Sequence, residues 1–182
     1  MSGSEHRKER FDALFAAHGA DIVAFCTWRA GSPSDAQDAA AEVFLTTWRR
    51  VDDVPDGDAA RVWLYATARK VIANQRRSNR RRVALQERLH LERASEAHSH
   101  DSQDLVVYEA LRRLSRRDRE VLLLSEWEDL SPAEIAAVLG CLTVTARGRL
   151  HRARHRFRAA YLELRNHSNE SRSSLRPVEG GS

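Results

Sequence analysis

Several features that would indicate an enzyme, a secreted protein or a membrane protein are missing from this 182-residue sequence. Its two cysteines, Cys26 and Cys141, are far apart and form no CxxC pair, so neither a disulfide framework nor a zinc finger is supported. The sequence has no glycine-rich phosphate loop, no Ser-His-Asp order and no paired carboxylates in an apolar setting, so we expect no catalytic residue, metal or cofactor. It also lacks a signal peptide's apolar core and any apolar run long enough to span a bilayer. We therefore expect a soluble, cytoplasmic protein that is not an enzyme and does not insert into membranes.

The sequence contains enough apolar residues to form helical cores. Hydrophobic residues make up 42% of the chain and there are only four prolines, which is too apolar for a disordered protein. The apolar residues recur at steps of three and four in several segments. We expect an all-α fold of two small helical domains joined by a flexible linker, the second domain containing a helix-turn-helix. The expected boundaries are residues 1–83, a linker at 84–104, residues 105–165, and a disordered tail at 166–182.

The first domain is expected to hold three helices. The first covers 9–28, and Gly31 to Pro33 then break the pattern. Ser34 or Asp35 should cap the second helix, which runs to residue 50 and has Trp48 among its candidate core residues. A third helix follows a loop at 51–60 and becomes basic after Thr67.

Aromatic residues lie beside the basic part of this third helix. Rings next to cations suit single-stranded nucleic acid, because bases stack on rings while cations follow the phosphates. The alternative is that Trp63 and Tyr65 belong to the core and the arginines form a solvated face. For Trp63 we favour the core, because an aromatic side chain contributes a large buried area.

The strongest local pattern lies between Ser131 and Leu164. Ser131 as N-cap, Pro132 in the first turn and Glu134 three residues after the cap predict a short helix with a capping box. Gly140 is placed to end that helix in a left-handed conformation. A second helix then carries an apolar face, so the segment is predicted to be a helix-turn-helix.

The other faces of this second helix are rich in arginine and have no acid before Glu163. A solvated helix face usually mixes both signs of charge, because like charges four residues apart repel. The clustering of one sign therefore favours an external anion, and we expect the helix to bind DNA. The alternative is an ordinary solvated face.

In this order, the segments resemble the bacterial sigma factors of the extracytoplasmic-function group. DAQDAAAEVFLTTWRR is similar to that family's DAEDLVQEVFLRAWR, and VWLYATARKVIANQRRSNRRR is similar to its WLYRIARN segment with an arginine-rich extension. ALRRLSRRDREVLLLSEWEDLSPAEIAAVLG resembles the family's stretch ending in EIA-x-x-LG, and GCLTVTARGRLHRAR aligns without a gap on GCSVGTVKSRLHRAR. The resemblance covers about Phe11 to Leu164.

The resemblance implies a protein that binds core RNA polymerase, directs it to promoters through −10 and −35 elements, and promotes melting and initiation. Its first domain would dock on the clamp helices of the largest polymerase subunit, and its second would contact the flap. An anti-sigma factor is an implied inhibitory partner. By position, the polymerase-binding residues would be Asp35, Gln37, Asp38 and Glu42. The −10 surface would hold Arg69, Lys70, Asn74, Arg76, Arg77 and Arg80, and the −35 surface Thr145, Arg147, Arg149, His151 and Arg152.

The sequence departs from the family pattern at several positions. Lys70 stands where the family often has Asn, Asp129 where it usually has Gly, and Leu142 where a Ser would cap the recognition helix. A missing cap costs about 1 kcal/mol unless Thr143 takes that role.

Two other interpretations remain open. A helix-turn-helix regulator that acts without polymerase docking would have a similar second half, but would need neither the acidic edge at 35–42 nor the basic helix at 69–82. A protein-binding adaptor whose basic faces meet acidic partners would show no sequence preference on DNA.

Overall fold

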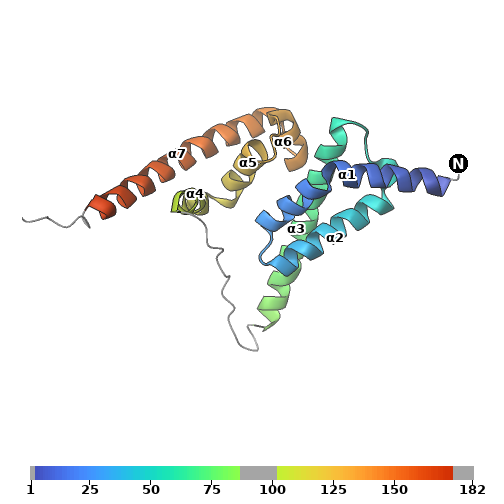
Figure 1. Cartoon of the computed structure of the whole chain (residues 1–182), viewed down its shortest axis with the longest axis horizontal. Coiled ribbons are helices and arrows are strands. Elements are labelled where there is room, and N and C mark those ends of the chain that lie inside the picture. Colours follow the sequence, from blue (N-terminus) through green and yellow to red (C-terminus); the bar gives the residue numbers. More distant parts are fainter. Residues whose placement is uncertain (1–2, 87–101, 174–182) are drawn as a thin grey trace, which may run out of the picture. The chain divides into compact units, whose positions relative to one another are not determined.

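The structure is a computed structural model that describes residues 3–86 and 102–173, where every regular element is a helix (Figure 1). The all-α prediction is therefore confirmed for the described residues. The helices form two compact units. In the first, α1 (Gly3–Arg29), α2 (Pro33–Arg49) and α3 (Asp58–Gln86) contact one another. In the second, α4 (Ser102–Arg113) and α5 (Arg116–Glu126) pack on α7 (Thr143–Ser173), and α6 (Pro132–Leu139) connects α5 to α7.

The core of the first unit consists of side chains from all three helices. Phe25 and Tyr65 are almost fully buried, with ring centroids 5.1 Å apart, and Ile22 and Val43 are completely inaccessible. A short 3₁₀ helix, η1 (Val51–Asp53), lies between α2 and α3 in the expected loop, and Gly57 at φ +62° precedes α3. These contacts fix the relative positions of α2 and α3.

Two local predictions in the first unit are wrong. The N-cap of α2 is Ser32, not Ser34 or Asp35, because Pro33 fits the first helical turn instead of ending a loop. The Ser32 hydroxyl oxygen accepts a hydrogen bond from the Asp35 amide at 3.1 Å and the hydroxyl donates to the Asp35 carboxylate at 3.0 Å. Trp48 is not a core residue but is 39% exposed, in an edge-to-face contact with Phe11 at the rim of α1 and α2.

The second unit follows the predicted capping pattern closely. Ser131 and Glu134 form the capping box of α6, with the Ser131 amide donating to the Glu134 carboxylate at 2.8 Å. Gly140 has φ +65°, and the Cys141 amide donates to the Ala136 carbonyl across the turn, which is the Schellman arrangement. The helix-turn-helix prediction is confirmed.

The ends of several elements differ from the predicted boundaries. Helix α3 continues to Gln86, α4 begins at Ser102, and α7 continues beyond Asn166 to Ser173. The remainder of the predicted linker and residues 174–182 lie outside the described residues.

Candidate nucleic-acid and protein interfaces

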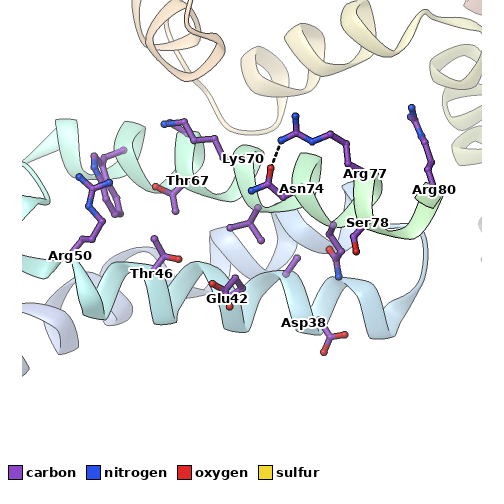
Figure 2. Close-up of a pocket in the computed structure, with 15 residues that line it drawn as sticks. Asp38, Glu42, Thr46, Arg50, Thr67, Lys70, Asn74, Arg77, Ser78 and Arg80 are labelled. Atoms are coloured by element: carbon purple, nitrogen blue, oxygen red, sulfur yellow. Dashed lines mark hydrogen bonds between the residues drawn. The ribbon is translucent and has the colours of Figure 1, made fainter. Parts of the chain in front are cut away.

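A groove of about 1200 Å³ lies between α2 and α3 (Figure 2). It brings together residues from two of the predicted sets, which are separated by about thirty positions in the sequence. From α2 it is lined by Asp38 and Glu42, and from α3 by Lys70, Asn74, Arg77 and Arg80.

The two sides of this groove differ in charge. Figure 2 shows Asp38 pointing away from α3, while Lys70, Arg77 and Arg80 point away from α2. Asp38, Glu42 and the three cations are exposed, and Glu42 forms an ion pair with Arg49 on its own helix at 3.8 Å. Charged side chains that point apart across a groove can bind two partners of opposite charge, one on each side.

Other predicted residues of the first unit have partners within the unit. The Asp35 carboxylate accepts hydrogen bonds from Ser32 and, at 3.2 Å, from Asn79 on α3, while Gln75 donates to the Asp35 carbonyl at 3.0 Å. The Arg76 guanidinium donates to the carbonyl of Arg29, at the end of α1. These bonds attach the α1–α2 connection to the second half of α3, so Asp35 and Arg76 also have structural roles.

Gln37 is exposed on α2 but does not line the groove, and Arg69 on α3 is half-buried. The side chain of Arg77 donates to Asn74 one turn away, which orders these two residues along the basic edge.

The groove also contains residues outside the predicted docking and −10 sets, among them Arg50, Trp63 and Thr67. Trp63 is half-buried, so the prediction that it belongs to the core is only partly right, and the guanidinium of Arg50 lies 5.8 Å from its ring centroid. Thr67 lines the same groove. A sequence signal for this grouping exists, because residues three and four apart lie on the same face of a helix. Trp63, Thr67 and Lys70 have this spacing along α3.

In the second unit, the predicted −35 residues occupy the first half of α7, directly after the helix-turn-helix turn. Arg147, His151 and Arg152 are exposed, and Thr145 and Arg149 are half-buried. Ala146, Leu150 and Ala153 are buried on the opposite face, as predicted. Among the described residues no hydrogen bond or ion pair joins Arg147, Arg149 or His151 to an acidic side chain.

Two arginines further along α7, Arg154 and Arg156, have acidic partners on α5. Arg154 donates to the Glu126 carboxylate at 2.7 Å and to the Ser125 hydroxyl at 3.1 Å, both near the end of α5. Arg156 contacts Asp118 in the first turn of α5. The basic surface without an acidic partner is therefore shorter than the arginine-rich stretch of sequence.

Asp118 is the one buried charged residue in the described cores, with 6% of its surface exposed. Burial alone raises the pKa of a carboxyl group, but hydrogen bonds from Ser115 and Arg156 and the positive charges of Arg156 and Arg152 outweigh it, so the pKa lies below its ordinary value. Asp118 is consequently a carboxylate at neutral pH and holds α7 against α5.

Within residues 3–86 and 102–173 there is no cluster of three or more His, Cys, Asp or Glu side chains that could hold a metal ion. No helix in the same part of the chain is long and apolar enough to cross a membrane. The fold and the charged surfaces define a helical protein whose first unit has a groove with acids on one side and cations on the other, and whose second unit has a helix-turn-helix.

Comparison with known proteins assigns both units. Residues 14–82 match the family model for sigma-70 region 2 and residues 104–157 match that for sigma-70 region 4. The extracytoplasmic-function (ECF) RNA polymerase sigma factor SigL of Mycobacterium tuberculosis is 30% identical over 157 residues, covering 84% of this chain and 89% of SigL. The ECF sigma factor SigC of the same species is 31% identical, covering 85% of this chain and 84% of SigC.

Solved structures agree with this assignment. The sigma factor RpoE of Bartonella quintana, solved in complex with the anti-sigma factor NepR, is 25% identical with a TM-score of 0.68, over 82% of this chain and 95% of RpoE. CnrH, solved with the cytosolic domain of CnrY, is also 25% identical, with a TM-score of 0.56 over 82% and 85% of the two chains. The chain belongs to the sigma-70 family, and within it to the ECF sigma factors. Members of this family are transcription initiation factors.

Proposed function

We propose that this protein binds core RNA polymerase, directs it to promoters that have −10 and −35 elements, and promotes promoter melting. The observation that carries the proposal is the separation of charge on the first unit, together with an arginine-bearing recognition helix on the second. Exposed acids on α2 suit a basic protein partner, whereas exposed cations on α3 suit nucleic acid. A regulator that only binds duplex DNA would need one of these surfaces, not both.

Each surface then has a role in initiation. Gln37, Asp38 and Glu42 contact the clamp helices of the polymerase, and Asp35 contributes through its hydrogen bonds to α3 as well as its charge. The −10 surface consists of Arg69, Lys70, Asn74, Arg76, Arg77 and Arg80, with Trp63 and Arg50 at one end of the groove as additional members. The −35 surface consists of Thr145, Arg147, Arg149, His151 and Arg152.

The two units bind one promoter together, because they are linked in a single chain. We place the domains at residues 1–83 and 105–165, with 84–104 as linker and 166–182 as tail. A second binding event on a linked site gains effective concentration, so promoters with the correct element spacing are favoured over either element alone. The polymerase performs the chemistry and this protein is not an enzyme. It acts in the cytoplasm, where its DNA and polymerase are found.

We also propose that an anti-sigma factor inhibits the protein. RpoE and CnrH, which share its fold, were solved with NepR and with the cytosolic domain of CnrY respectively. An inhibitor of this kind would cover the docking acids on α2 or the recognition helix.

Run-off transcription from a promoter library, with and without this protein added to core polymerase, tests the function. We expect specific transcripts whose promoters share two spaced elements. The doubly substituted variant Asp38→Ala with Glu42→Ala should lose core binding while keeping −35 duplex binding, because the acids lie on the first unit only. Asp21→Ala, which removes an exposed acid from α1, is the matched control and should behave as wild type.

Sequence-specific DNA binding with neither core binding nor transcripts would instead establish the plain helix-turn-helix regulator. Binding to DNA that shows no sequence preference at physiological salt would favour the adaptor.

A further inference from the structure

Two uncharged residues, Val144 and Gly148, lie among the exposed arginines on the outward face of α7. Val144 and Gly148 are four residues apart, so they lie one above the other on the helix surface. Arg147 and Arg152 flank them, and His151 continues the same face three residues after Gly148. We call Val144 and Gly148 the apolar strip. It lies at the centre of the predicted −35 surface, yet neither of its residues was among the predicted DNA contacts.

No internal contact requires a glycine at position 148. Its φ is not in the left-handed range, so the backbone conformation is one that any residue adopts. A Cβ added there would meet only the end of the flexible Arg152 side chain, at 3.4 Å. Glycine inside a helix nevertheless costs about 1 kcal/mol relative to alanine. A glycine at such a position is explained by the close approach of something outside the helix.

Val144 is equally unexplained by the packing of the unit. It is 71% exposed, so the fold gains little from its side chain. Gly148 thus lowers the stability of α7, and Val144 adds little to it, although both lie on the exposed face of the helix.

We propose that the apolar strip recognises a thymine in the −35 element, with the Val144 methyl groups against the C5-methyl of the base and Gly148 facing the base-pair edge. This inference rests on the proposed function and specifies what its recognition helix reads. In the major groove, thymine alone among the four bases presents a methyl group, and apolar side chains contact it. A glycine in the next turn lets the helix backbone approach the base pair closely enough for this contact. Arg147 and Arg152 on either side supply contacts to phosphates or guanine edges.

The test uses the complete protein bound to core polymerase and a promoter obtained from the library. Each thymine of its −35 element is replaced in turn by uracil, which removes only the C5-methyl group, and promoter affinity is measured. We expect one position at which this replacement weakens binding about fourfold, the value for one buried methyl group at about 0.8 kcal/mol. Val144→Ala should weaken binding to a similar extent and should abolish the sensitivity to uracil at that position only.

The control for side-chain truncation is Leu162→Ala. Leu162 is another exposed apolar residue of α7, 39% exposed and 18 residues further on, about 27 Å along the helix. It should leave promoter affinity and uracil sensitivity unchanged. Binding of core polymerase should be the same for wild type and Val144→Ala.

Gly148→Ala tests the proposal that Gly148 faces the base-pair edge. If Gly148 had only a structural role, thermal stability and promoter affinity would change in the same direction. Alanine should raise the thermal stability of the second unit and yet weaken promoter binding about fivefold or more, since the added methyl group occupies the space of the base pair.

Three results would overturn the inference while leaving the proposed function intact. They are equal affinity for every uracil-substituted promoter, persistent uracil sensitivity in Val144→Ala, and unchanged promoter affinity in Gly148→Ala. Loss of core binding in Val144→Ala would assign the strip to a protein contact and would also overturn it. If wild-type protein forms no promoter-specific complex with polymerase, the proposed function itself fails and the inference fails with it.

Discussion

The contact between Asp118 and Arg156 is expected to stabilise the second unit by an amount that depends on pH. Asp118 is buried at the start of α5, whereas the Arg156 side chain on α7 is 57% exposed. The Asp118 carboxylate accepts hydrogen bonds from Ser115 at 2.8 Å and from Arg156, and hydrogen bonds to charged groups contribute about 1.5–3 kcal/mol each. Because Arg156 is exposed to solvent, we expect its hydrogen bond to Asp118 to contribute only about 1 kcal/mol to the free energy of unfolding. We therefore expect Asp118→Asn to lower the free energy of unfolding by about 2 kcal/mol at pH 7.

A double-mutant cycle isolates the pair itself. Arg156→Gln alone should cost about 1 kcal/mol, and the same change should cost much less once Asp118 has become Asn. The matched control is Arg158→Gln, which removes an exposed arginine two residues further along α7 and should change stability by less than about 0.5 kcal/mol. Because the chain has two units, stability is measured by pulsed hydrogen exchange in increasing urea, and the peptides of α5 and α7 are analysed separately from those of α1–α3.

The pH dependence follows from the direction of the shift in pKa. The pKa of Asp118 is lower in the folded protein than the ordinary value of about 3.9, because the hydrogen bonds from Ser115 and Arg156 favour the carboxylate more than burial disfavours it. The stability that this gives is fully present above the ordinary pKa and is lost as the pH falls through the folded pKa. The difference between wild type and Asp118→Asn should therefore be constant from pH 7 to about pH 5 and should shrink in more acidic solution. A difference that does not change with pH, or a coupling energy near zero, would refute this account.

Three further predictions follow from the structure. Replacing Arg147 by alanine should lower the slope of log affinity against log salt concentration for promoter binding by about 1. Arg156→Gln should leave this slope unchanged, because Arg156 contacts Asp118. Equal changes for the two variants in a salt titration would contradict the assignment of Arg147 to DNA and Arg156 to the contact with α5. Asp129 has φ +48°, so Asp129→Gly should be neutral or stabilising while Asp129→Ala should cost up to about 1 kcal/mol, and urea midpoints that rank the two variants the other way would contradict it. Burial raises the pKa of the Cys26 thiol to about 11, with Arg29 offsetting part of the rise, so Cys26 should react with iodoacetamide at pH 8 far more slowly than the half-buried Cys141; peptide mapping that shows equal labelling would exclude a buried Cys26.

Local sequence signals predicted the second unit better than the first. The cap at Ser131, the capping-box residue Glu134 and the left-handed Gly140 involve only near neighbours in the chain, so the sequence contains all the information needed. Asp129 is a further local case. Its backbone is left-handed, a conformation that glycine adopts without strain and aspartate adopts more readily than most residues, which accounts for the family's usual glycine and for the aspartate found here. Local rules failed at Ser32, where a proline at the first helical position was interpreted as part of a loop.

The pairing of residues on different helices could not be predicted in this way. Asp35 matched the polymerase-docking pattern and also satisfied the rule for an acid in the first turn of a helix. Its hydrogen bond to Asn79, 44 positions away, depends on how α2 and α3 pack. Trp63 was assigned to the core from its size, yet its half-buried place at the groove depends on which helix faces it.

The arginines of α7 show why the composition of a segment overstates its binding surface. The absence of acids from the helix before Glu163 suggested that every arginine needed an external anion. In the folded unit, Glu126 and Asp118 of α5 supply that anion to Arg154 and Arg156, 28 and 38 positions away in the sequence. Arg147, Arg149 and His151 have no such acid among the described residues, and they lie in the first half of the helix, where a recognition helix contacts base edges. The acids of α5 thus divide one basic helix into a part that holds the unit together and a part that is left for DNA.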